Sequence, residues 1–135
     1  MSADLTADAL RAAPTELRQH DATWTLEAEG WRSFQPITTA RGDPLIVVTR
    51  VTSSAPLTSG VRIESVTLAR GDEVWSGSAT EEVPRAPAAT VVEAVTRDGP
   101  PWGAGDSVDL VARIADGSGA IVLLRARTFA IARVH

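Results

Sequence analysis

The most constraining pattern in this chain is an alternation of apolar residues in its last third. Between residues 107 and 116, Val108, Leu110, Ala112 and Ile114 occupy every second position. Side chains that recur with this period lie on one face of a half-buried β-strand. The tetrad Asp-Gly-Ser-Gly at 116–119 follows, and its residue types tolerate the positive φ of a tight hairpin. The pattern predicts an antiparallel hairpin whose second strand lies within the apolar run 121–134.

Further segments with strand character precede this hairpin. We expect about seven strands, with the spacing typical of an all-β sandwich, at 24–34, 45–52, 61–69, 74–75, 90–97, 107–116 and 121–134. The apolar positions change parity near Ser65 and again between Leu124 and Phe129. A bulge at each place would reconcile the two halves, and near Ser65 a strand that crosses between sheets would do so as well. Gly30 is expected to mark another bulge. The predicted fold is a single antiparallel, immunoglobulin-like β-sandwich.

Residues 1–21 differ from the rest and are interpreted as a leader, with the β-sandwich domain at 22–135. Leu5 and Leu10 fall on one side of a short helix that would start at Ser2 or Thr6 and end at Pro14. Such a helix is too short to be stable unless it docks on the domain. A loosely ordered leader is the alternative.

One stretch resembles a known class of domains. Residues 105–119, Gly-Asp-Ser-Val-Asp-Leu-Val-Ala-Arg-Ile-Ala-Asp-Gly-Ser-Gly, look like the penultimate strand and final hairpin of bacterial immunoglobulin-like and fibronectin type III-like domains. The resemblance implies a β-sandwich that serves as a binding or spacer module, and it carries no catalytic residues. The chain departs from antibody domains because it has no cysteine for their inter-sheet disulfide.

Composition excludes several classes of function. Without cysteine there are no disulfides, thiolate nucleophiles or cysteine-based metal sites. The 13 basic residues are scattered and the formal net charge is −4, which argues against a nucleic-acid partner. No apolar run approaches the roughly 20 residues of a membrane span. No signal peptide is recognisable, so both a cytoplasmic protein and one exported by a signal missing from this sequence remain open.

The residues that catalysis or metal binding would need are sparse. The two histidines, His20 and His135, lie far apart and lack the spacing of a triad or a metal site. Asp106 and Asp109 are expected near one end of a strand and Asp116 at the other, so these carboxylates do not converge. We therefore predict no catalytic residues, no metal and no cofactor.

The tryptophans are the remaining candidates. Trp24 and Trp75 are expected in the core. Trp102 lies between Pro-Pro and Gly-Ala-Gly, where it is either a plug over one end of the sandwich or a contact residue for a partner. Trp31 and Phe34 either cover the same end or form an exposed aromatic patch. Trp102, Trp31 and Phe34 are thus the candidate binding residues.

These observations favour a non-catalytic binding or assembly module. Its partner is expected to be a protein, with self-association through an unprotected edge strand as one possibility. One alternative is a small-ligand carrier or small enzyme, in which Arg125, Arg127 and Glu93 would point into a pocket enclosed by the curled sheet. Another is a structural spacer of a secreted assembly.

Overall fold

The structure is a computed structural model, and it describes residues 5–33 and 44–134. Within these residues the chain forms one helix and ten strands: α1 Ala7–Ala12, β1 Glu16–Gln19, β2 Ala22–Ser33, β3 Leu45–Ser53, β4 Val61–Arg70, β5 Glu73–Ser78, β6 Val91–Gly99, β7 Ser107–Asp116, β8 Ile121–Arg125, β9 Phe129–Ala130 and β10 Ala132–Val134.

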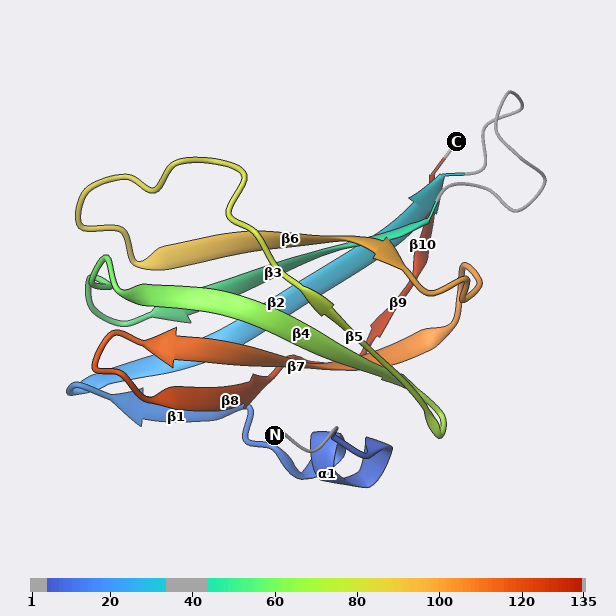
Figure 1. Cartoon of the computed structure of the whole chain (residues 1–135), viewed down its shortest axis with the longest axis horizontal. Coiled ribbons are helices and arrows are strands. Elements are labelled where there is room, and N and C mark those ends of the chain that lie inside the picture. The colour runs from blue at the N-terminus through green and yellow to red at the C-terminus, as the bar shows by residue number, and fades with distance from the viewer. Residues whose placement is uncertain (1–4, 34–43, 135) are drawn as a thin grey trace.

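The strands build two sheets that face each other (Figure 1). The first sheet, sheet A, has the order β1-β2-β3-β6, and β10 lies beside β2. The second, sheet B, has the order β5-β4-β7-β8, and β9 lies beside β7. All strand pairs are antiparallel except β10 with β2, which is parallel. The expected all-β sandwich is confirmed.

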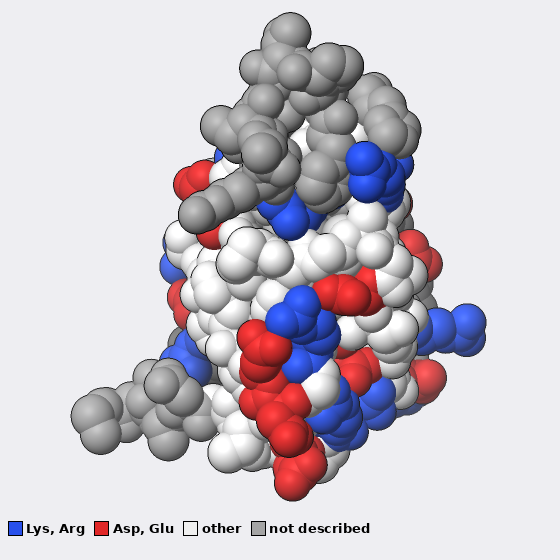
Figure 2. Space-filling view, turned by 90° about the vertical axis from the view of Figure 1, so that its right-hand side faces the viewer, with Lys and Arg blue, Asp and Glu red and all other residues white. Residues whose placement is uncertain are grey.

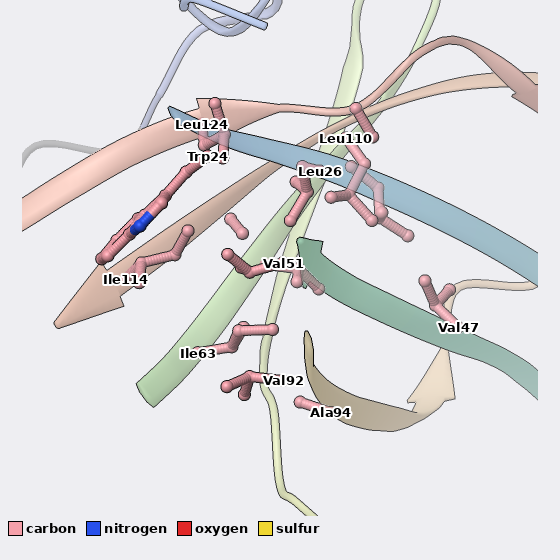
Figure 3. Packing of buried hydrophobic residues seen from close by; sticks show 14 of the residues in the cluster. Trp24, Leu26, Val47, Val51, Ile63, Val92, Ala94, Leu110, Ile114 and Leu124 are labelled. Carbon is pink, nitrogen blue, oxygen red and sulfur yellow. The ribbon is translucent and has the colours of Figure 1, made fainter. Parts of the chain in front are cut away.

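The core lies between the two sheets and follows the predicted alternation. Trp24 and Val51 from sheet A meet Ile63 and Ile114 from sheet B (Figure 3). In β7 the alternating apolar residues at 108, 110, 112 and 114 are fully buried, as predicted. Val111 points to the opposite face and is also buried, because α1 covers it.

Both parity changes mark real irregularities. In β4, Ile63 lies opposite Ile114 and Ser65 opposite Arg113, so two steps of β4 face one step of β7. This is the bulge that the sequence predicts.

The last run contains the second irregularity. Arg125 lies opposite Val111 and Phe129 opposite Val108, so four steps of the run face three steps of β7. After this bulge the run leaves β7, and β10 pairs with β2 of sheet A.

The prediction of a bulge at Gly30 is wrong. The register between β2 and β3 is regular through Gly30, which lies opposite Val47. The glycine instead permits a close approach. A Cβ atom at this position would lie 3.1 Å from Cε2 of Phe129 and 3.3 Å from the carbonyl oxygen of Ile46.

The predicted helix forms and docks on the outer face of sheet B. It begins after Thr6, whose hydroxyl accepts a hydrogen bond from the N–H of Ala9, and it ends before Pro14. Leu10 is fully buried against Ala69 and Val111. The segment interpreted as a leader therefore contains a docked helix and also β1, which pairs with β2.

The hairpin between β7 and β8 has the predicted turn. Gly117 and Gly119 adopt positive φ values of 90° and 99°. The Asp116 carboxylate accepts hydrogen bonds from the N–H and the hydroxyl of Ser118, at 2.8 and 2.6 Å. These local bonds account for the aspartate without any ligand.

Candidate functional site

Trp102 is packed into one end of the sandwich with 4 % of its surface exposed. Its backbone carbonyl accepts a hydrogen bond of 3.2 Å from the guanidinium of the buried Arg32. The guanidinium of Arg70 lies over the indole, 5.1 Å from the ring centroid. This is the position that the plug interpretation predicts, and in this structure the ring offers little surface to a partner.

Ion pairs surround the plug. Arg70 pairs with Glu73 at 2.6 Å and with Asp106 at 2.8 Å. Hydrogen bonds from Arg70, and then from the N–H of Gly103, hold the pKa of Asp106 below its ordinary value. The pKa of Glu73 is also lowered, first by its hydrogen bond with Arg70 and to a smaller degree by one with the Trp102 side chain. Figure 2 shows acidic and basic side chains mixed on this end of the molecule.

The other aromatic candidates have different positions. Trp31 is half-buried on β2, next to the end where β10 pairs. Phe34 lies outside the described residues. Trp24 is a core residue, as predicted, whereas Trp75 is only half-buried at the border of the core, beside Gly77.

The three polar residues of the carrier hypothesis do not come together. Arg125 and Arg127 line a groove between the two sheets. Glu93 lies on the outer face of sheet A, where it pairs with Arg50 at 2.7 Å. Arg125 uses its Nε–H to bind the carbonyl oxygen of Ala13.

This groove lies on the side of the sandwich where β1 of sheet A and β8 of sheet B are found. It has a volume of about 650 Å³ and is lined by residues 15–16, 25–28, 125 and 127–129. The chain crosses between the sheets on either side of it. The carbonyl oxygen of Pro14 accepts a hydrogen bond from the N–H of Arg125 in β8, after which the chain passes to sheet A as β1. The N–H of Ile131 donates to the carbonyl oxygen of Asp106, after which the chain passes to sheet A as β10. The groove lies between these two crossings.

One wall of the groove is an unpaired length of β2. β1 pairs with residues 22–25 of β2, and β10 pairs with residues 31–33, so residues 26–30 have no strand partner on this side. Thr23 exchanges hydrogen bonds with Ser54, next to β3. Because backbone groups alternate in direction along a strand, those of Leu26 and Ala28 point away from β3, into the groove.

Apolar and charged side chains both line the groove. Leu26 is buried at its floor, and Ala28 and Phe129 are half-buried. Glu16 and Glu27 are exposed on the sheet A side, and Arg127 is exposed on the other side. No ion pair among the described residues involves these three charged side chains.

The sequence predicts that Arg125 and Arg127 point into a pocket, and both line this groove, but it does not predict the other walls. The walls of the groove come from segments more than 100 residues apart that meet only through tertiary packing. Two local signals pointed toward it without revealing it: the parity change after Leu124 and the glycine at position 30. The first marks the crossing, and the second marks the place where Phe129 closes the end of the groove.

Within residues 5–33 and 44–134, no group of three or more His, Asp or Glu side chains is placed to hold a metal ion. The single helix of this part of the chain is too short to cross a membrane. The chain matches no protein-family model and no curated protein sequence.

Proposed function

We propose that this chain is a non-catalytic binding or assembly module of the immunoglobulin-like or fibronectin type III-like kind, which binds an extended segment of a protein at the open edge of β2. The strand order supports the first part. The chain passes between the sheets several times, with β2 and β3 in sheet A, β4 and β5 in sheet B, β6 in sheet A, and β7 and β8 in sheet B. Such Greek-key connections are typical of these sandwiches.

The unpaired stretch of β2 is the observation that carries the binding proposal. Native proteins normally cover or blunt a sheet edge, because its free backbone groups pair with other chains. Thr80 bridges to Val95 on β6, and the carbonyl oxygen of Pro14 accepts the N–H of Arg125 on β8, so both of these edges are partly covered. β5 also has a free side, but β2 is the edge that lines the groove. On β2, residues 26–30 lack such a cover, and an apolar floor lies directly beside them.

The dimensions suit a short extended segment. Five residues of strand extend about 16 Å. The groove volume of about 650 Å³ lies in the range of sites that enclose a ligand. A guest strand would exchange backbone hydrogen bonds with Leu26 and Ala28 and place alternate side chains on the floor, which is the chemistry of β-strand addition.

The test is a titration of the full chain, labelled with ¹⁵N, with blocked five-residue peptides that alternate Val with Thr, Lys or Glu. We expect at least one peptide to shift the amide resonances of residues 26–30. Ala28→Pro removes the N–H that faces the groove and should weaken that binding at least about tenfold, because one backbone bond and the close approach of the guest are lost.

Val74→Pro is the matched control. Val74 lies in β5, whose partner β4 occupies only one side, and its N–H points to the free side because Arg70 and Glu73 close the hairpin. This variant should bind like the wild type. The proposal is overturned when none of the peptides shifts the amide resonances of residues 26–30 in the wild-type chain, and this outcome needs no variant. It is also overturned when a folded Ala28→Pro protein binds as tightly as the wild type.

A further inference from the structure

The outer face of sheet A carries a row of charges that alternate in sign from strand to strand. Glu93 on β6 pairs with Arg50 on β3 at 2.7 Å, and Arg50 pairs with Glu29 on β2 at 3.0 Å. Hydrogen bonds with Glu29 and Glu93 raise the pKa of Arg50 above its ordinary value. From β6 to β2 the order is acidic, basic, acidic, so the position beyond β2 is the one where a basic residue would continue the row.

Glu27 is the carboxylate that this row leaves without a partner. It lies opposite Arg50 in the β2–β3 register, but Arg50 binds Glu29 instead. Glu27 is exposed, lines the groove and has no ion pair among the described residues. Glu16, at the start of β1, is a second exposed carboxylate on the same side of the groove, and it too has no ion pair within the described part of the chain.

The two faces of a guest strand would therefore meet different surroundings. Its outward side chains would lie beside Glu27, and its inward side chains would lie on Leu26, Ala28 and Phe129. Opposite charges on neighbouring strands attract, and like charges directly opposite each other repel. The exposed Arg127 and the half-buried Arg125 on the far side of the groove are the features that would instead favour an acidic guest.

We propose that the segment bound at the β2 edge alternates basic and apolar residues, with its basic side chains beside Glu27 and its apolar side chains on the groove floor. This inference rests on the proposed function, because it names the chemistry of the guest at the same edge. It identifies the partner as a protein with an exposed extended segment of basic–apolar–basic pattern.

The test compares two blocked peptides, Lys-Val-Lys-Val-Lys and Glu-Val-Glu-Val-Glu, by the shifts of the amides of residues 26–30 in the full chain at low salt. We expect the basic peptide to bind at least about tenfold more tightly, because two or more cross-strand charge pairs change from repulsive to attractive. Glu27→Arg should remove or reverse this preference.

Asp72→Arg controls for the net charge of the protein. It makes the same change of charge at an exposed turn of sheet B, and it should leave the preference intact. Asp72→Arg should keep the melting temperature of the wild type, because its site is an exposed turn. Glu27→Arg should lower the melting temperature slightly, because the new arginine lies opposite Arg50, and circular dichroism checks that both variants fold.

The outcomes separate this inference from the proposed function. If both peptides move the amides of residues 26–30 equally, or the acidic one binds more tightly, the charge preference is overturned while strand addition stands. If neither peptide moves these amides, both proposals fail. Loss of the preference in Asp72→Arg as well as in Glu27→Arg would show that net charge alone produces it, which also overturns the inference.

Discussion

The plug formed by Trp102 makes a quantitative prediction for Trp102→Ala. The indole is 4 % exposed, lies in the main core cluster and has the Arg70 guanidinium over its ring. A buried tryptophan removes about 150–250 Å² from water, which at about 25 cal/mol per Å² corresponds to about 4–6 kcal/mol as an upper bound. Alanine retains part of this burial, and the lost cation–π contact adds about 0.5–1 kcal/mol.

We therefore expect Trp102→Ala to lower the free energy of unfolding by about 4 kcal/mol, within the range of about 3–5 kcal/mol found for such truncations. The assay is urea denaturation followed by circular dichroism, with the slope of the transition checked for a change in the unfolded state. Trp75→Ala is the control, because Trp75 is only half-buried and its truncation should cost about half as much.

A loss below about 2 kcal/mol, or one no larger than that of Trp75→Ala, would refute the reasoning, since the ring would then contribute little to the core. Trp102 does not line the groove. A folded Trp102→Ala protein should therefore still bind a peptide at the β2 edge. Loss of that binding without loss of stability would show that Trp102 is a contact residue.

Three further variants test other parts of the fold. Asp21→Gly should raise the free energy of unfolding by about 1 kcal/mol in urea denaturation, because Asp21 has a φ of 63° in the β1–β2 turn and glycine adopts that conformation without steric cost; an unchanged or lower value would contradict the turn. Leu10→Ala should lower the free energy of unfolding by about 2–4 kcal/mol, because the Leu10 side chain is fully buried between α1 and sheet B. Ala9→Gly, at an exposed position of the same helix, should lower it by about 1 kcal/mol or less. Equal effects would mean that the helix does not dock. Hydrogen bonds from Ser118 lower the pKa of Asp116, so the stabilisation by this carboxylate is fully present above the ordinary pKa of 3.8 and is lost as the pH falls below it. The urea midpoints at pH 6 and pH 3 should therefore differ less in Asp116→Asn than in the wild type. An equal difference would count against this bond.

The strands and their irregularities could be predicted because they leave local signals. Alternation identified β2 and β7, and the parity change at Ser65 located the bulge that the β4–β7 register shows. Pro14 predicted the end of the helix, and Thr6, one of the two predicted starts beside Ser2, is its N-cap, since capping and chain termination depend on residues close in sequence.

Features that depend on distant contacts could not be predicted. β1, Glu-Leu-Arg-Gln, is too short to show a period, and it forms because β2 offers it an edge. Val111 looked like an outward residue and is buried only because α1 lies on it. Gly30 carries a signal of close approach that sequence alone does not distinguish from a bulge, because Phe129 comes from the other end of the chain.

Dependence on distant contacts also explains why the walls of the groove could not be predicted. Its existence requires that the chain cross between sheets at two places and leave part of β2 unpaired between them. Each crossing is short, and only their common position on one side of the sandwich creates the hollow.

Amide hydrogen exchange of Ala28 in the full chain tests the open edge most directly. Glu27 has its backbone groups on the β3 side of β2, whereas the N–H of Ala28 points into the groove without a strand partner. We predict that Ala28 exchanges faster than Glu27 in the free protein, and that the Lys-Val-Lys-Val-Lys peptide slows Ala28 without slowing Glu27 further. Equal protection of the two amides in the free protein, or an Ala28 amide that the peptide leaves unchanged, would contradict an open edge that receives a strand.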